Sequence, residues 1–321
     1  MEQITCLDLR GNIPRRIQPP PRTVLCLGNF DGVHIAHTAL LAEGIRLAQT
    51  ISEKTSLLHT CGVFCFVRPT ADYAPRKSGE CPVHLTTLRD KLTLLAEGGA
   101  EIAFLCEFPA VKELSPEAFI QLLKNQCHCH AAVCGYNHRF GRGAQGTHEL
   151  LARHFGKEAV TVLPAMELCG EPISSSRIRS HLSNGEVEDA ARLLGRPYSL
   201  SATVIHGKGL GHKLGFPTAN QYFPAEQIIP KRGVYAVLCH TPDGVRVGVA
   251  NVGCHPTVDA RARVNCETYI PHFDGDLYGY RMKVEFLSYL RPEQKFASLD
   301  ELTAAIRRDA EQALNCFSDQ I

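Results

Sequence analysis

Apolar and polar positions in the first half of the chain alternate between two periods, one typical of buried strands and one typical of helices. Short apolar runs that suit buried parallel strands recur at 24–27, 63–66, 102–105, 131–134 and 160–163. Between these runs, apolar residues lie three or four positions apart, as on the buried face of a helix. Strands that alternate with helices predict an α/β fold, a doubly wound parallel sheet of these five strands.

The pattern changes near residue 185. Two short helices are predicted at 173–183 and 187–194, and Gly195-Arg196-Pro197 ends the second. Strand-like runs separated by turn residues follow, and they predict a small antiparallel β-barrel. These runs are 234–238, 245–252, 264–270 and 282–286.

A last helix is predicted after the barrel. Its start carries the capping box Ser298-Leu299-Asp300-Glu301, and Leu302, Ile306 and Leu314 are expected on one buried face. We therefore expect two domains, 1–184 and 185–321, which is the number that 321 residues favour.

Composition narrows the class of protein. Hydrophobic residues make up 44% of the chain and charged residues 21%, an ordinary globular mixture. A net charge of +1 provides no broad electrostatic surface for nucleic acid or membrane, so we expect small-molecule substrates and a local anion site. No apolar run is long enough to span a bilayer, and residues 1–16 lack the apolar core of a signal peptide. We expect a cytoplasmic protein, with oligomerisation left open.

The chain has 14 cysteines, many of them in the apolar strand-like runs, and we expect reduced and buried thiols. The segment Cys127-His128-Cys129-His130 suggests a metal site, but no Cys-x-x-Cys pair accompanies it. Neighbouring residues of a strand also point to opposite faces. We interpret this segment as a polar loop before a strand.

A first chemical motif joins the first predicted strand to the following helix. It contains Gly28, Asn29, Phe30, Asp31 and Gly32, followed by the histidines. His34 and His37 lie three residues apart, so both can face one side of the first helical turn. Backbone N–H groups at a helix start favour phosphate, and two imidazoles can donate hydrogen bonds to triphosphate oxygens. The alternative is a plain strand-turn-helix with incidental histidines.

A second motif lies at 205–220 and is rich in glycine and basic residues. It lacks the Gly-Lys-Ser/Thr of a Walker A loop, but its glycines let backbone amides approach phosphate closely. The residues expected to cradle phosphate are Gly207, Lys208, Gly209, Gly211, Lys213 and Gly215. Thr218 and Asn220 provide neutral oxygens on one face of an extended segment, which suits Mg²⁺. Glu267, on a predicted strand, could take the proton from an attacking hydroxyl, so the set predicts phosphoryl transfer.

Together the two motifs resemble those of the bacterial bifunctional riboflavin kinase/FAD synthetases. Residues 28–37 resemble the GxFDGxHxGH motif of nucleotidyltransferases, and 135–141 and 173–179 resemble the family's GxNFxFG and ISSTRIR segments. Residues 207–220 resemble the kinase motif GxxxGxxLGFPTAN, which includes Pro217, and the resemblance covers almost the whole C-terminal half.

The resemblance implies a Rossmann-like nucleotidyltransferase domain followed by a riboflavin kinase barrel. Such an enzyme uses ATP and Mg²⁺ to phosphorylate riboflavin to FMN and then adenylates FMN to FAD. It implies that Thr218 and Asn220 bind Mg²⁺ and that Glu267 is the base. It further implies nucleotide contacts in the first domain from Asn137, Ser174, Ser175, Ser176 and Arg177.

Two departures from the family pattern affect the first domain. Ala36 stands where the family has glycine between the two histidines. The family's Phe-Glu/Asp-Pro-His-Pro run is replaced by Phe66-Val67-Arg68-Pro69-Thr70, which lacks the acid and the histidine. We therefore expect FAD formation to be weaker than FMN formation.

Three other functions stay open at this point. The chain could be a riboflavin kinase with a degenerate adenylyltransferase domain, a flavin-sensing regulator without turnover, or a nucleotidyltransferase for another acceptor. The set Thr218, Asn220 and Glu267 argues against a regulator, because sensing needs no metal ligands and no base.

Overall fold

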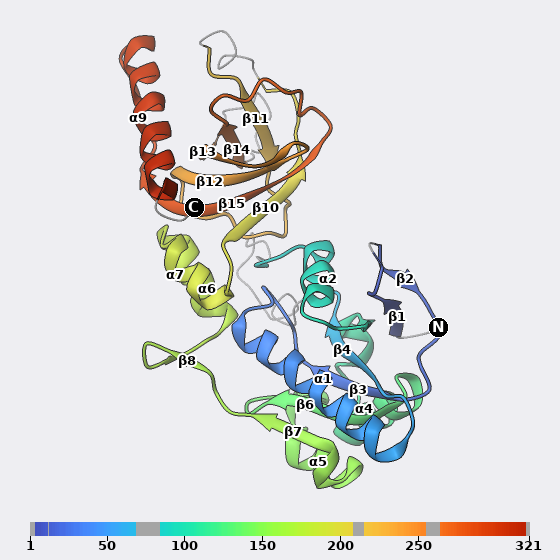
Figure 1. Ribbon diagram of the computed structural model, residues 1–321. Coiled ribbons are helices and arrows are strands. Elements are labelled where there is room, and N and C mark those ends of the chain that lie inside the picture. The colour runs from blue at the N-terminus through green and yellow to red at the C-terminus, as the bar shows by residue number, and fades with distance from the viewer. Residues whose placement is uncertain (1–3, 12, 69–83, 208–214, 255–263, 319–321) are drawn as a thin grey trace. The chain divides into compact units, whose positions relative to one another are not determined.

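The computed structural model describes residues 4–11, 13–68, 84–207, 215–254 and 264–318 (Figure 1). The chain divides into two compact units, Met1–Ser175 and Ser176–Ile321, and each is described by itself. The functional boundary near residue 184 stays a prediction and is given a test below.

The first unit is built on a seven-stranded sheet in the order β2-β1-β5-β4-β3-β6-β7. Five of its strands are parallel: β3 (Thr23–Leu27), β4 (Thr60–Phe66), β5 (Ile102–Cys106), β6 (Cys129–Gly135) and β7 (Val160–Leu163). They confirm the predicted doubly wound sheet. The chain runs outward from β3 to β5 and then returns to place β6 on the other side of β3, so the switch point lies between β3 and β6.

Helices cover both faces of this sheet. The helices of this unit are α1 (Ile35–Thr55), α2 (Leu88–Glu97), α3 (Phe108–Val111), α4 (Pro116–Gln126) and α5 (His148–Phe155). Alternate residues of β3 point to opposite faces: Val24 and Cys26 pack with residues of α1 and α2, and Leu25 and Leu27 with residues of α4 and α5. A strand buried on both faces explains the continuous apolar run in the sequence. A short hairpin, β8 (Glu167–Leu168) and β9 (Glu171–Pro172), follows β7.

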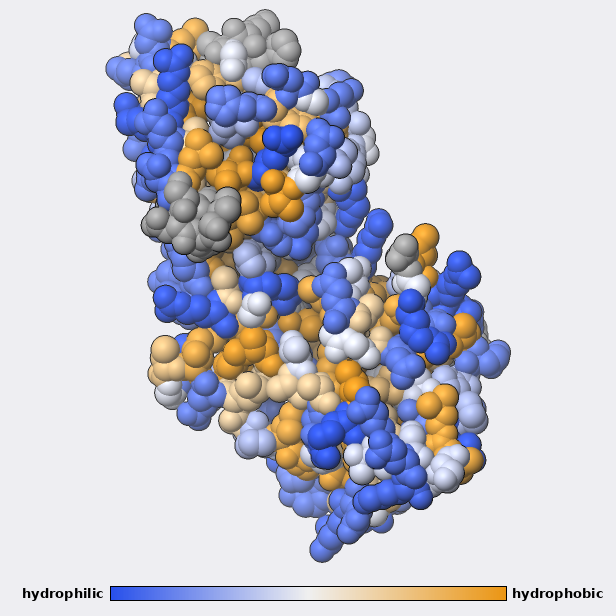
Figure 2. All heavy atoms as spheres, viewed as in Figure 1, coloured by the Kyte–Doolittle hydropathy of each residue, from blue (hydrophilic) through white to orange (hydrophobic). Residues whose placement is uncertain are grey.

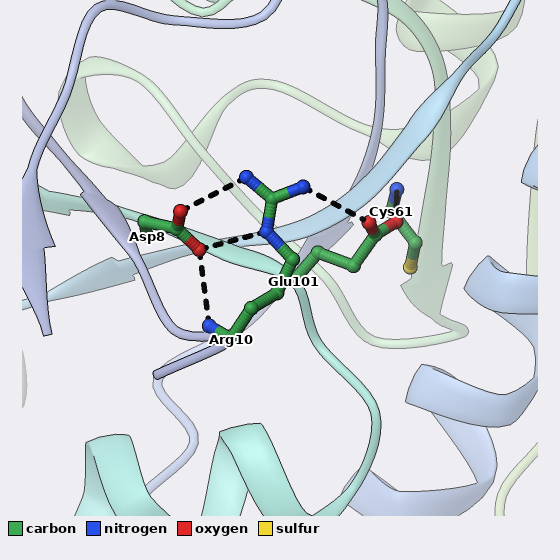
Figure 3. Close-up of polar contacts among 4 residues, drawn as sticks. All are labelled: Asp8, Arg10, Cys61 and Glu101. Carbon is green, nitrogen blue, oxygen red and sulfur yellow. Dashed lines mark hydrogen bonds and ion pairs between the residues drawn. The ribbon is translucent and has the colours of Figure 1, made fainter. Parts of the chain in front are cut away.

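The N-terminal edge of the sheet was not predicted from the sequence. β1 (Ile4–Asp8) pairs antiparallel with β5, and β2 (Arg15–Arg16) pairs with β1. Arg10 holds this edge: its guanidinium donates two 2.9 Å hydrogen bonds to Asp8 and lies 3.8 Å from Glu101 (Figure 3). These hydrogen bonds lower the pKa of Asp8 to about 2. Glu101 also accepts from the backbone N–H of Cys61 at 3.3 Å, which ties the edge to β4.

The second unit begins with α6 (Ser175–Asn184) and α7 (Val187–Leu194) and continues into six antiparallel strands. The strands are β10 (Tyr198–Thr203), β11 (Thr218–Tyr222), β12 (Gly233–Thr241), β13 (Gly244–Cys254), β14 (Val264–Tyr269) and β15 (Arg281–Arg291). Their order is β10-β15-β12-β13-β14-β11, and a bridge between Ile205 and Asn220 joins the two ends. The predicted small β-barrel is therefore confirmed.

Buried Gln221 reinforces the barrel seam. Its Nε2 donates to the carbonyl oxygen of Ala202 at 2.6 Å and to that of Met282 at 2.8 Å. One side chain of β11 thereby ties β10 and β15 together.

Helix α9 (Leu299–Ser318) closes the unit, as predicted. Ser298 Oγ accepts from the backbone N–H of Glu301 at 3.2 Å, which confirms the predicted cap. The buried stripe is narrower than expected: Ala310 and Ala313 pack on the barrel, whereas Leu314 is 41% exposed, which corrects its predicted burial. The outward face of the helix is hydrophilic (Figure 2).

An ion pair fastens α9 to the barrel. Arg291 at the end of β15 donates to buried Asp309 through Nε at 3.0 Å and through a terminal nitrogen at 2.7 Å. This two-point geometry orients both side chains.

We predict that the second half folds and makes FMN without the first, since units of this size usually carry their own core. The backbone carbonyl of Leu182 in α6 accepts from the N–H of Lys231 at 2.9 Å, so α6 is part of this unit. A fragment that begins at Ser176 should therefore melt about 5–10 °C higher than one that begins at Gly185. Thermal melts and a kinase assay of both fragments check this. Unfolded or inactive fragments beside an active full-length protein would contradict it.

Candidate active sites

The turn after β3 carries the first predicted motif. Phe30 and Val33 have φ angles of 51° and 40°, in the left-handed region that non-glycine residues avoid, and Gly32 has φ 84°. Such backbone costs on the order of 1–3 kcal/mol per residue and persists where the surroundings hold it. Asp31 provides part of that support. Its buried Oδ1 accepts from the N–H of Leu85 at 2.9 Å, and its carbonyl oxygen accepts from Ser175 Oγ at 2.8 Å.

The two histidines lie together at the start of α1. His34 is the N-cap residue and His37 belongs to the first turn, and their rings stack with centroids 3.7 Å apart and planes 14° apart. The expectation that spacing of three would bring both imidazoles to one side is thereby met. The N-terminus of α1 adds unpaired N–H groups and a positive dipole end at the same place.

A cavity of about 810 Å³ opens at the switch point between β3 and β6. Among its lining residues are seven of the predicted site residues: Gly28, Asn29, His34, His37, Asn137, Ser174 and Ser175. Phe30 and Asp31, both buried, belong to the turn behind the cavity together with Gly32. We interpret Asp31 as a residue that positions the turn.

Sequence reasoning missed the aromatic wall of this cavity. It is formed by Phe64, Phe66, Phe108, Phe119 and Phe140. The rings pack against one another. The ring centroid of Phe119 lies 5.4 Å from that of Phe64 and 5.3 Å from that of Phe140, and the centroids of Phe66 and Phe108 are 5.3 Å apart. The sequence signal that could have predicted this wall is the position of Phe64 and Phe66 near the carboxyl end of a parallel strand, where such sheets bind ligands. His138 also lines the cavity; burial lowers its pKa to about 4, so its imidazole is neutral at physiological pH.

Of the residues in the two departures from the family pattern, Ala36 and Phe66 line this cavity. Ala36 lies between the two histidines in sequence. Arg68 forms an exposed ion pair with Glu107 at 3.7 Å. Pro69 and Thr70 lie outside the described residues. Ser176 and Arg177 lie in the first turn of α6, which belongs to the second unit.

The second motif lies on one side of the barrel. Thr218 and Asn220 share a face of β11, and Asn220 Nδ2 lies 3.2 Å from Thr218 O and 3.4 Å from Thr218 Oγ1. A Cβ on Gly207 would lie 2.5 Å from Asn220 Nδ2, so only glycine allows this approach. Gly215 has φ 79° and Pro217 is exposed. The remaining predicted cradle residues, Lys208, Gly209, Gly211 and Lys213, lie outside the described residues.

Glu267 lies directly beside these residues. The strand register pairs it with Asn220 across β14 and β11, so both side chains point to the same face. Glu267 is half-buried, and its Oε1 accepts from Asn265 Nδ2 at 3.1 Å. The neighbouring Cys266 and Thr268 are fully buried inside the barrel, as alternation along a strand requires.

This arrangement fits a hard cation beside a base. The Thr218 hydroxyl and the Asn220 amide provide uncharged oxygen donors, the ligand type that Mg²⁺ accepts together with substrate phosphates. The Asn220 carboxamide packs directly against the backbone of Gly207, where any side chain would collide with it.

Four buried cysteines of the first unit have thiols that are unsuited to nucleophilic or metal-binding chemistry. Burial raises the pKa of the Cys6, Cys106 and Cys134 thiols to about 11 and that of the Cys129 thiol to about 12. Thiols of such high pKa are poor nucleophiles and metal ligands. In the described parts of the chain, the one group of three potential metal ligands is His181, Glu186 and Asp189, which does not involve the 127–130 segment.

Comparisons with known proteins agree with the family that both motifs predicted. A family model described as FAD synthetase matches residues 17–177, and one described as riboflavin kinase matches residues 194–317. A bifunctional riboflavin kinase/FMN adenylyltransferase from Listeria monocytogenes is 32% identical over 92% of both chains. The Escherichia coli protein of the same name is 36% identical over 93% of this chain and 94% of its own.

A solved structure supports the fold over nearly the whole chain. It is a crystal structure from Streptococcus pneumoniae titled as a macrolide-efflux protein, with a TM-score of 0.81 and 29% identity. The similarity covers 93% of this chain and 96% of that one. No helix in the described parts of this chain is long and apolar enough to cross a membrane. Given the two relatives with 32% and 36% identity across both motifs, the chain belongs to the family of bifunctional riboflavin kinase/FMN adenylyltransferases.

Proposed function

We propose that Glu267, Thr218 and Asn220 carry riboflavin phosphorylation in the barrel and that His34 and His37 carry adenylyl transfer in the first unit. The observation that carries the kinase assignment is the register that places Glu267 beside Asn220, whose carboxamide packs against Gly207. A base, oxygen donors and a phosphate cradle are the parts that phosphoryl transfer requires.

In the kinase reaction, Glu267 takes the proton of the terminal ribityl hydroxyl of riboflavin. The hydroxyl oxygen attacks the γ-phosphorus of ATP, and ADP leaves. Asn265 fixes the orientation of the carboxylate through its 3.1 Å hydrogen bond. Thr218 and Asn220 would hold Mg²⁺, which supplies neutralisation of the phosphate charge when bound. The glycine-rich segment, with Lys208 and Lys213, would contact the phosphates.

In the adenylyl transfer, a phosphate oxygen of FMN attacks the α-phosphorus of ATP, and pyrophosphate leaves. No covalent intermediate on the protein is needed. His34 and His37 donate hydrogen bonds to the phosphate oxygens as charge develops on the leaving group. Ser174, Ser175, Ser176 and Arg177 are proposed to contact the triphosphate. The aromatic wall of the cavity suits the flat ring system of a flavin or an adenine.

One assay tests the function as a whole. The protein is incubated with riboflavin, ATP and Mg²⁺, and FMN and FAD are separated by chromatography. We expect FMN to accumulate over FAD. FMN without any FAD, even when FMN is supplied, would favour the kinase-only alternative, and bound but unchanged riboflavin would favour a sensor.

Ala36→Gly should raise the rate of FAD formation several-fold and leave FMN formation unchanged. Ala36 lines the cavity together with the two histidines, and glycine lets a nucleotide approach the backbone more closely. The measurement is the initial rate of FAD formation from supplied FMN. Ala165→Gly, at another cavity-lining position, is the control. An unchanged or lower rate in Ala36→Gly would show that Ala36 does not limit the reaction.

We also propose that the substrates are the protein's partners and that it works in the cytoplasm. Free, buried cysteines suit a reducing compartment, and a net charge of +1 gives no broad surface for nucleic acid.

A further inference from the structure

Helices α6 and α7 meet at a tight corner at the start of the second unit. The backbone N–H of Gly185 donates to the carbonyl oxygen of Leu182 at 3.1 Å, and that of Glu186 donates to the carbonyl oxygen of His181 at 2.9 Å. Gly185 has a φ of 86°, in the left-handed region that glycine adopts without strain. Leu182 and Val187, on either side of the corner, are fully buried. The corner therefore holds the ends of both helices in a fixed arrangement.

Three side chains with metal-binding atoms meet at this corner. His181 of α6, Glu186 and Asp189 each offer one ligand atom, and these atoms lie within 4.8 Å of one another. Glu186 and Asp189 are three residues apart at the start of α7, so both carboxylates lie on one side of its first turn. His181 Nδ1 lies 2.7 Å from Glu186 Oε2. The His181 and Glu186 side chains are 22% and 46% exposed, so an ion can reach them from solvent.

Two features of the corner favour a bound cation. Glu186 is the N-cap residue of α7, a position from which a carboxylate normally accepts from a backbone N–H of the first turn. Within α7, all of which the structure describes, its side chain makes no such hydrogen bond and is directed to His181 instead. The carboxylates of Glu186 and Asp189 also repel each other at this separation, and a cation between them removes the repulsion. Arg192, itself 67% exposed, contacts Asp189 through Oδ1 at 3.1 Å, and the second oxygen can bind a metal ion at the same time.

The ligand set determines which ion fits. Mg²⁺ and Ca²⁺ take oxygen ligands, whereas an imidazole beside carboxylates suits Zn²⁺ and neighbouring divalent transition metals. Zinc binds imidazole nitrogen and carboxylate oxygen at about 2.0–2.2 Å, so two ligand atoms of a tetrahedral site lie roughly 3.4 Å apart. Rotation of the exposed Glu186 and Asp189 side chains can bring the ligand atoms to this separation.

We propose that His181, Glu186 and Asp189 bind Zn²⁺ or a related divalent transition metal, which links α6 to α7. Nδ1 of the neutral imidazole coordinates the ion, with the ring proton on Nε2, and each carboxylate contributes one oxygen. Three protein ligands leave a fourth position for water. This site uses other residues than the Mg²⁺ site proposed at Thr218 and Asn220. Zinc stabilises the second unit, because the ligands come together only in the folded corner.

Calorimetric titration of the full-length protein with ZnCl₂, in an excess of MgCl₂, tests the proposal. We expect one zinc ion per chain to bind at this site with a dissociation constant below about 10⁻⁵ M. Saturating zinc should raise the Tm of the second unit by about 5 °C, and MgCl₂ alone should not. His181→Ala and Asp189→Asn should each weaken this site by more than about 10-fold and abolish the zinc-dependent rise in Tm, since even loss of an outer partner of a metal ligand costs that much.

Glu188→Gln is the matched control. Glu188 is exposed in the same turn of α7 and does not belong to the group of three ligands, so this variant should bind zinc like the unaltered protein. With a chelator present, every variant should melt within about 2 °C of the unaltered protein, because exposed ion pairs contribute little to stability. Zinc binding that is unchanged in both ligand variants, or absent from the unaltered protein, would overturn the proposal and leave the three side chains as an ion-pair network.

Discussion

Glu267→Gln should lower kcat for FMN formation by about 10²–10⁴-fold, the usual contribution of a positioned general base. The amide keeps the size of the carboxylate, and its oxygen can still accept from Asn265, so the strand register and the fold should be retained. The change removes only the ability to take the proton of the attacking hydroxyl. Rates are measured by chromatography of FMN, and nucleotide affinity by titration calorimetry.

Two comparisons make this result specific. Nucleotide affinity should stay within about two-fold of the unaltered protein, because no ligand oxygen of Thr218 or Asn220 is changed. Glu311→Gln, the same substitution on the exposed side of α9, should leave kcat unchanged. FMN production at the normal rate by Glu267→Gln would remove Glu267 from the proposed mechanism.

His34→Ala and His37→Ala should each lower FAD formation from supplied FMN by about 10²–10³-fold, the typical cost of one preorganised hydrogen-bond donor to developing charge. The stacked rings lie at the start of α1, at the cavity in the first unit. FMN formation should be unchanged in both variants, because the kinase residues belong to the second unit.

His130→Ala is the control for these variants. His130 is exposed at the start of β6, whereas the cavity opens at the other end of that strand. We expect His130→Ala to form FMN and FAD at the rates of the unaltered protein. Persistent FAD formation in the double variant His34→Ala/His37→Ala would mean that adenylyl transfer does not depend on these imidazoles, and a parallel loss of FMN formation would point to damage of the fold.

The sequence by itself determined those features that depend on neighbouring residues. The buried parallel strands were predictable because burial on both faces leaves a continuous apolar run, and the ends of the helices carry local signals such as Ser298. The spacing of three predicted that His34 and His37 share one side of the helix start, and their rings stack there although His34 is the N-cap residue with an extended backbone. The edge strands β1 and β2 were missed because they lie at the margin of the sheet, where burial and hence the apolar signal are weaker.

Only the tertiary structure decided what lies opposite what. Asp31 belongs to the predicted nucleotide-binding motif, yet in the fold its carboxylate accepts a hydrogen bond from the backbone N–H of Leu85. The place of Glu267 beside Asn220 depends on the register of β14 against β11, which no local spacing encodes. Shifting that register by one residue would move every side chain to the other face, and the register is set by burial across the whole barrel. Spacing along the sequence thus predicted the type of reaction, and strand pairing between distant segments determined which residues lie together in the site.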